Sequence, residues 1–132
     1  MSTVYRNDVA LNDSSKDFTF PGPRHIQQIA VKLVSTATVG NRRIVARVLN
    51  PAATVVAQIA AGATQAASLT HNYMFAPGLP RETAVVDNSL MVPLPMPGLY
   101  VPAGHTLRVL DSAAIDAAAD DMDVHIVDVD PR

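Results

Sequence analysis

The sequence lacks cysteine and tryptophan and has few aromatic or charged residues. Without cysteine the chain has no thiol nucleophile, no disulfide and no thiolate metal ligand. Aromatic residues make up only 5% of the chain, which disfavours a sugar-stacking platform. Charged residues make up 17% and the formal net charge is -2, so the positive excess typical of nucleic-acid binding is missing. We therefore expect no nucleic-acid partner.

Long hydrophobic runs are also missing. No stretch of about 18 uninterrupted apolar residues could cross a bilayer, and the first residues have no apolar centre of the kind a signal peptide requires. We expect a protein made in the cytoplasm, with no membrane partner. What the chain does have is 132 residues, 48% of them hydrophobic, which is enough for one domain with one core.

The local pattern predicts strands rather than helices. Ten prolines and six glycines are scattered through the chain, and the intervals between them are rich in Val, Ile, Thr and Ala. An amphipathic helix over Ala52–Ala67 is the alternative at one point, but β-branched Thr54, Val55 and Val56 and the interruption at Gly62 favour a strand there.

Eight segments are expected to form strands: Phe18–Phe20, His25–Thr38, Arg42–Leu49, Thr54–Ala60, Gln65–Phe75, Leu90–Leu94, Thr106–Leu110 and Met122–Val129. This count predicts an all-β protein, an antiparallel two-sheet β-sandwich over residues 17–132. Residues 1–16 are expected to form a polar N-terminal arm. A short helical segment is expected near 112–120, because Asp111 and Ser112 resemble a helix N-cap.

Charge is unevenly distributed along the chain. No acidic residue occurs between Phe18 and Arg81, whereas seven aspartates follow Leu110. The basic and acidic segments can pair within one fold, between copies, or with a charged partner surface. The alternative is two solvated faces, because isolated surface charges contribute little to stability.

No motif predicts catalysis or a cofactor. The four histidines are widely separated, no Gly-x-Ser-x-Gly elbow occurs, and Glu82 is the only glutamate. Asp116, Asp120, Asp121 and Asp123 lack the spacing and the glycine of an EF-hand, so helix capping and solvation are favoured over calcium binding. We expect no catalytic residue, no cofactor and no metal, and hence a protein that is not an enzyme.

Several segments resemble small jelly-roll structural proteins of tailed bacteriophages. They are Val101–Val109, Asp111–Asp116, Ala119–Val124, Thr38–Arg43 and Tyr73–Gly78. The resemblance implies a jelly-roll-like sandwich and a virion protein on the outer capsid surface. The role that the resemblance implies is that of a cement or decoration protein, which clamps adjacent subunits of the major capsid protein.

A clamp needs exposed contact groups and self-association. The residues predicted to contact the capsid or another copy are Tyr5, Arg6, Arg42, Arg43, Arg47, Pro77, Leu79 and Arg81. A homodimer is the first expectation and a trimer the next. The alternative function is a head-fibre or tail-associated β-sandwich protein that binds another virion protein or a host glycan.

Overall fold

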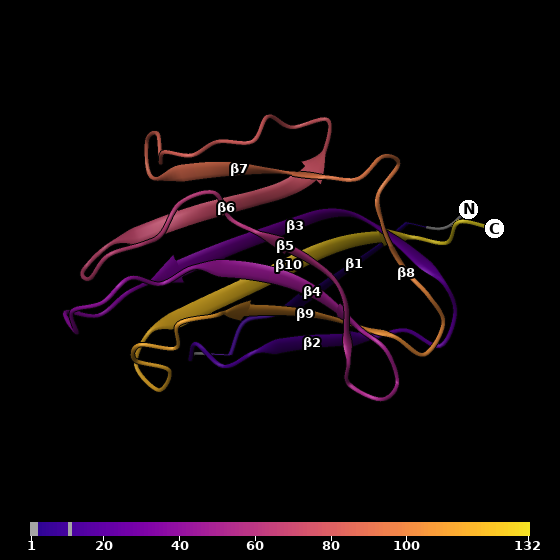
Figure 1. Cartoon of the computed structure of the whole chain (residues 1–132), viewed down its shortest axis with the longest axis horizontal. Helices are drawn as coiled ribbons and strands as arrows, with labels where there is room; N and C mark the ends of the chain where they lie inside the picture. Colours follow the sequence, from indigo (N-terminus) through magenta and orange to yellow (C-terminus); the bar gives the residue numbers. More distant parts are fainter. Residues whose placement is uncertain (1–2, 11) are drawn as a thin grey trace.

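The computed structural model describes residues 3–10 and 12–132. These residues form β-strands joined by turns and loops (Figure 1). The strands are β1 (Thr3–Asp8), β2 (Lys16–Thr19), β3 (Arg24–Val34), β4 (Ile44–Leu49), β5 (Val55–Ala60), β6 (Thr70–Pro77), β7 (Ser89–Leu94), β8 (Leu99–Val101), β9 (Thr106–Asp111) and β10 (Asp121–Val129). All eight strands expected from the sequence are present, and β1 and β8 are additional.

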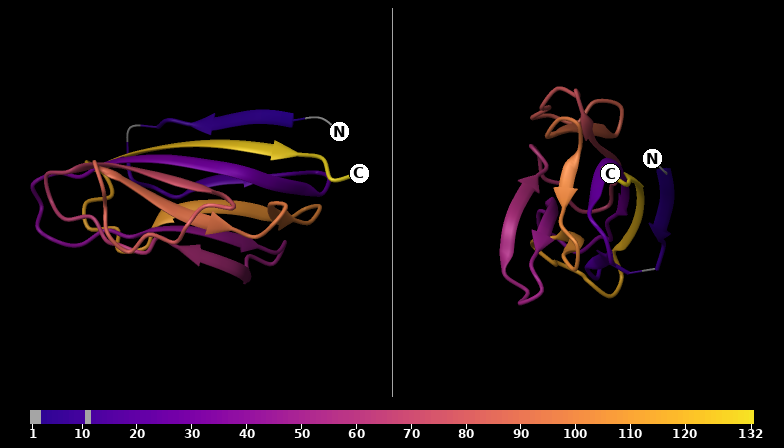
Figure 2. Two further views of the ribbon diagram at one scale, coloured as in Figure 1. Left: turned by 90° about the horizontal axis from the view of Figure 1, so that it is seen from above. Right: turned by 90° about the vertical axis from the view of Figure 1, so that its right-hand side faces the viewer.

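The strands form two sheets that pack face to face. The larger sheet has the order β1-β10-β3-β6-β7, with β8 pairing to β3, and the smaller sheet has the order β2-β9-β4-β5. Figure 2 shows the sheets as separate layers, with β1 and β10 in one and β4 and β5 in the other. The prediction of a two-sheet β-sandwich is confirmed.

Eight of the strands pair as one nested hairpin. β4 pairs with β5 at its tip, followed outward by β3 with β6, β2 with β9 and β1 with β10, and every one of these pairs is antiparallel. Such a ribbon buries one face only when it rolls into two layers, because each strand needs a second sheet to cover its apolar side. β7 and β8 are inserted between β6 and β9.

One pair of strands departs from the predicted antiparallel sandwich. β6 and β7 run parallel, with Tyr73 opposite Leu90 and Phe75 opposite Val92. Parallel neighbours need a long crossover connection, which residues 78–88 supply. The prediction of a wholly antiparallel sandwich is therefore wrong for this pair of strands.

The helix expected near 112–120 does not form. Ala114 has a φ of 49°, which interrupts a right-handed helix at its first turn. The side chain of Asp116 accepts hydrogen bonds from the hydroxyls of Thr36, at 2.7 Å, and Thr38, at 3.0 Å. These long-range contacts hold the segment as a series of turns, so the local capping signal was outweighed by tertiary structure.

The segment expected to be an arm includes a strand. Thr3–Asp8 pairs with β10 along its whole length, with Tyr5 opposite Val127. Residues 1, 2 and 11 of that segment lie outside the described part of the chain. The paired part is β1, an edge strand of the larger sheet (Figure 1).

The core lies between the inner faces of the two sheets. Its largest fully buried apolar side chains include Phe20, Ile29, Leu33, Leu107 and Met122. Burial of such side chains stabilises the fold by about 25 cal/mol for each Å² of apolar surface removed from water. In the part of the chain that the structure describes, no helix has the length and hydropathy needed to span a membrane.

Candidate functional site

Three buried aspartates meet at one end of the sandwich. Asp13 lies in the β1–β2 connection, Asp111 ends β9, and Asp120 directly precedes β10. All three are at least 96% buried, with relative exposures of 3%, 4% and 0%. One carboxylate oxygen from each lies within 4.8 Å of the others. We call this group the acidic triad. It lies at the end of the molecule opposite the two termini, where the β9–β10 connection turns (Figure 1).

Arg42 neutralises one member of the triad. Its Nε donates to Oδ2 of Asp120 at 2.8 Å and its Nη2 donates to Oδ1 at 3.2 Å, and both side chains are fully buried. The backbone N–H of Thr36 also donates to Asp120, at 2.8 Å. Burial by itself would raise the pKa of Asp120, but these hydrogen bonds outweigh it and hold that pKa below its usual value. Asp120 is therefore ionised in the folded protein.

The other two members have unpartnered oxygens. Both carboxylate oxygens of Asp13 and Oδ2 of Asp111 are buried without a hydrogen-bond partner. Lys16 is buried nearby, but its Nζ donates to the backbone and side-chain oxygens of Asn12, at 3.0 and 2.8 Å. Burial, together with the neighbouring carboxylates of Asp111 and Asp120, raises the pKa of Asp13 to about 8. Without a cation, this cluster retains a proton at neutral pH.

We expect Asp13→Asn to remove a pH dependence of stability in metal-free buffer. The pKa of Asp13 is 3.8 as a free side chain and about 8 when folded, so the folded state binds its proton more tightly between these values. The stability from protonated Asp13 is fully present below about pH 4 and is lost as the pH rises through about 8. Groups that face Asp13 are Asp111, Asp120 and Lys16.

The measurement is urea unfolding of both proteins at about pH 5, 7 and 9. The free energy of unfolding of the wild type, relative to the variant, is expected to fall by about 1.4 kcal/mol per pH unit inside the window. A constant difference across these pH values would contradict a buried, protonated Asp13.

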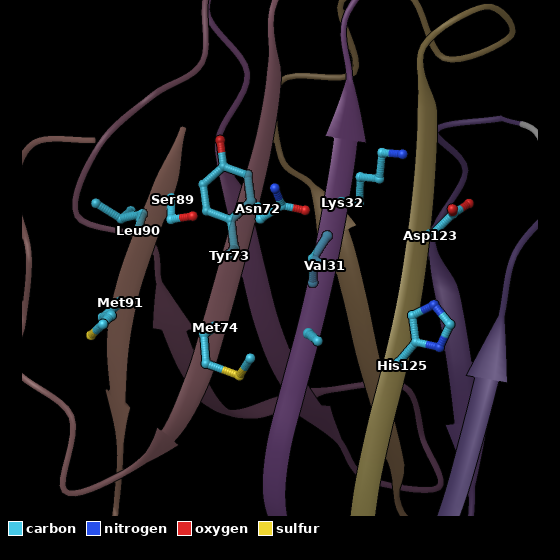
Figure 3. A pocket seen from close by; sticks show the side chains of 11 residues that line it. Val31, Lys32, Asn72, Tyr73, Met74, Ser89, Leu90, Met91, Asp123 and His125 are labelled. Atoms are coloured by element: carbon cyan, nitrogen blue, oxygen red, sulfur yellow. The ribbon is translucent and has the colours of Figure 1, made fainter. Parts of the chain in front are cut away.

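A second feature is a groove on the outer face of the larger sheet. Its volume is about 500 Å³, and it crosses β10, β3, β6 and β7. Lys32, Met74, Met91, Asp123 and His125 project from these neighbouring strands (Figure 3). The groove is lined mainly by apolar atoms with a few charged groups at one side, which suits a protein segment or a small ligand.

The predicted contact residues of β1 are exposed. Tyr5 is 58% exposed, and its ring stacks on His125 with a hydrogen bond between the Tyr5 hydroxyl and the imidazole. The Nε of Arg6 donates to Oδ2 of buried Asp128 at 2.7 Å, while the Arg6 side chain stays 38% exposed. Both side chains are held in position at the edge of the larger sheet.

Arg42 differs from the other predicted contact residues because it is not exposed. Its side chain is fully buried against Asp120, so it has no surface to offer a partner. Arg43 and Arg47 are partly exposed: Arg43 Nη1 donates to the carbonyl of Ala61 at 2.5 Å, and Arg47 Nε donates to Gln58 at 2.7 Å. Arg42 and Arg43 directly precede β4, and successive side chains of an extended segment point to opposite sides, which is why Arg42 enters the interior and Arg43 reaches the surface.

The loop that follows β6 brings three predicted residues to one corner of the molecule. Pro77 and Leu79 are partly exposed and Arg81 is exposed. Arg81 Nη1 donates to the carbonyl of Ala60 at 3.2 Å, next to the carbonyl that Arg43 binds. Arg43 and Arg81, 38 positions apart in the sequence numbering, therefore lie on the same end of β5.

Sequence reasoning missed the acidic triad. Asp120 was considered for calcium together with Asp116, Asp121 and Asp123, but its actual neighbours are Asp13 and Asp111. No spacing rule relates positions 13 and 111, because they meet only through the pairing of β2 with β9. Asp111 directly follows a predicted strand, but Asp13 lies in the segment expected to be a polar arm, so no sequence signal joined the two.

The chain has little detectable similarity to known proteins. No family model and no curated protein sequence matches it. One similar solved structure is that of infectious bursal disease virus Gx strain, with 11% sequence identity and a TM-score of 0.42. The match covers 96% of this chain and 32% of that one, so this chain spans about a third of its length. A similarity this low supports no inference about function, which has to be argued from this chain.

Proposed function

We propose that this chain is a structural virion protein, a cement or decoration protein on the outer surface of a bacteriophage capsid. The observation that carries the proposal is the strand order. Nested pairing of β1 with β10, β2 with β9, β3 with β6 and β4 with β5 is the order of a jelly roll, an architecture used by viral capsid domains. The segments that resemble phage jelly-roll proteins support the same assignment.

The arrangement of exposed groups supports a clamp between adjacent major capsid subunits. Tyr5 and Arg6 lie on β1, at one edge of the larger sheet, and β7 forms its other edge. Strands about 4.8 Å apart place these edges roughly 19 Å from each other. The loop with Leu79 and Arg81 leads to the far edge. Two contact surfaces separated in this way can hold two neighbouring subunits, and many such weak contacts on a lattice bind strongly together.

The protein is proposed to act as a homo-oligomer without catalytic activity or a cofactor. A two-fold dimer remains the first expectation, because isologous dimers are the commonest closed assembly, and a trimer is the next. Sedimentation equilibrium of the purified chain distinguishes the monomer from these two states.

The test is binding of purified protein to capsids that lack it. We expect saturable binding to assembled shells, no binding to unassembled capsid protein, and greater resistance of the shells to heat. Binding to isolated tails instead of shells would contradict the proposal and favour the tail-associated alternative, whereas binding to a glycan array would favour a receptor-binding role.

Arg43→Ala combined with Arg81→Ala is expected to weaken shell binding at least tenfold. These side chains form a basic corner, and loss of both charges from a contact with an acidic capsid surface is expected to cost about 1.4 kcal/mol or more in total, which is a factor of ten in affinity. The measurement is co-sedimentation with shells over a range of protein concentrations. Arg132→Ala is the matched control, since Arg132 pairs locally with Asp130. Equal binding by the double variant and the wild type would exclude this corner from the contact surface.

A further inference from the structure

The acidic triad combines three features of a cation site. Its carboxylates come from three separate segments, they are buried, and one oxygen of each lies within 4.8 Å of the others. From this geometry we infer that Asp13, Asp111 and Asp120 bind a hard divalent cation, Ca²⁺ being the ion that fits best. The site is independent of the capsid role, and its test uses no capsid.

The unpartnered oxygens are the independent observation that points to a ligand. The relative exposure of Asp13 is only 3%, yet neither of its carboxylate oxygens accepts a hydrogen bond from an N–H group or a cationic side chain. Oδ2 of Asp111, which is 4% exposed, is in the same situation. Buried polar atoms are nearly always satisfied in folded proteins, since an unmet carboxylate carries a large desolvation penalty.

The cationic side chains of the surroundings are already used. Arg42 binds Asp120, and Lys16 binds Asn12 and Ser14. In residues 3–10 and 12–132, neither Asp13 nor Asp111 takes part in an ion pair. Oδ1 of Asp111 accepts hydrogen bonds from the backbone N–H groups of Arg43 and Ala113, at 3.1 and 3.0 Å. These two bonds fix the orientation of the carboxylate and therefore the position of Oδ2. When all three carboxyl groups are ionised, three oxygens thus have no N–H or cationic side chain to meet them, and in the metal-free protein only the proton that Asp13 holds can bridge Asp13 and Asp111.

The donor atoms and their setting select the ion. The triad offers only oxygen, which favours Ca²⁺ and Mg²⁺ over ions that prefer sulfur or imidazole. Ca²⁺ accepts irregular arrangements of protein oxygens, whereas Mg²⁺ demands near-octahedral geometry and usually keeps several of its waters. A buried group of carboxylates from three separate segments therefore favours Ca²⁺.

A bound ion would join the N-terminal part of the chain to the connection between β9 and β10, which crosses from one sheet to the other. The backbone N–H of Asp13 already donates to the carbonyl of Ala117 at 2.9 Å, and that of Met122 donates to Asn12 at 3.1 Å. These bonds bring the β1–β2 connection against the β9–β10 connection, and the ion adds a link among the same segments. Because the unfolded chain does not assemble the three carboxylates, Ca²⁺ binds the folded state selectively and stabilises it.

The experiment uses the full chain, freed of metal with EDTA and dialysed. Isothermal titration calorimetry with Ca²⁺ is expected to show one site per chain. At a Ca²⁺ concentration of 100 times Kd, the Tm is expected to rise by about 8 °C. Mg²⁺ is expected to bind more weakly and to raise the Tm less.

Variants locate the site. Asp13→Asn and Asp111→Asn are each expected to abolish the Ca²⁺-dependent rise in Tm, and both keep the side-chain shape, so both are expected to fold. Asp121→Asn, next to the triad but outside it, is the matched control and is expected to retain the full shift. Absence of any Ca²⁺ binding by the wild type, or an undiminished shift in Asp13→Asn, would overturn the inference.

Discussion

Replacing Arg42 by methionine is expected to lower the free energy of unfolding by about 3–5 kcal/mol. The guanidinium is fully buried and makes two hydrogen bonds to Asp120, at 2.8 and 3.2 Å. Methionine fills much of the volume but leaves the Asp120 carboxylate without a counter-charge, adjacent to Asp13 and Asp111. The cost comes from this unpaired buried charge more than from the lost attraction of the pair.

Urea unfolding at neutral pH measures the effect, and Arg108→Met is its control. Arg108 makes a two-pronged pair with Asp17, at 2.8 and 2.9 Å, but both side chains are more than a third exposed, at 36% and 43%. Exposed pairs of this kind contribute about 1 kcal/mol or less. The double variant Arg42→Met with Asp120→Leu is expected to recover much of the loss. Similar losses for Arg42→Met and Arg108→Met would show that burial of the first pair is not important.

Replacing Gly62 by valine is expected to destabilise the protein by about 3 kcal/mol and to displace the loop that carries Arg81. A Cβ at position 62 would lie 2.2 Å from the backbone oxygen of Glu82, far inside van der Waals contact. The obstacle is main chain, so no side-chain rotation relieves it. The loop must therefore move away from β5, and the Arg81 contact with the carbonyl of Ala60 is lost with it.

Gly78→Ala in the same loop is the matched control. Gly78 has a φ of +79°, but nothing lies within 4 Å of the position a Cβ would take. Alanine there is expected to cost about 1 kcal/mol, from backbone strain alone. Thermal unfolding measures stability, and limited proteolysis of the loop over residues 78–88 reports its displacement. Proteolysis of Gly62→Val at the wild-type rate would contradict close docking of this loop on β5.

Sequence patterns predicted most strands because alternation of apolar and polar residues marks a half-buried strand. In the expected strand Gln65–Phe75, alternation assigns Leu69, His71, Tyr73 and Phe75 to one face; the last three are buried, whereas Leu69, which precedes β6, is 39% exposed. In β4 the same reasoning assigns Ile44, Ala46 and Val48 to the inner face, where the core contains them, and Val45 to the outer face, although Val45 is buried as well. These assignments depend only on neighbours in the sequence, which is why they could be made without a structure.

The two additional strands lack that signal. β1 has the sequence Thr-Val-Tyr-Arg-Asn-Asp, and its side chains are exposed or only partly buried. It is a strand because β10 offers an unpaired edge, and the Arg6 pair with Asp128 fixes its position. β8 is three residues long and is recruited by β3. In both cases the partner strand determines the structure, and a single sequence does not specify the partner.

The sequence also could not show which charged side chains are buried. Arg42 and Arg43 are adjacent and chemically alike, yet one is fully buried and the other partly exposed. Which of them enters the interior depends on the register of β4 and on the location of Asp120, 78 positions later. For the same reason the acidic triad could not be anticipated, since its members are brought together only by the completed sandwich.

The nested hairpin has a consequence for how the protein is made. Its outermost pair joins Thr3 to Val129, so β1 cannot find its partner until β10, the last strand of the sandwich, has been made. The larger sheet cannot be completed before β10 has left the ribosome, and its completion is expected on the millisecond-to-second timescale of proteins dominated by distant contacts. Until then β1 and one edge of β3 lack the strand that covers them, and nascent copies are most exposed to pairing with each other at that stage.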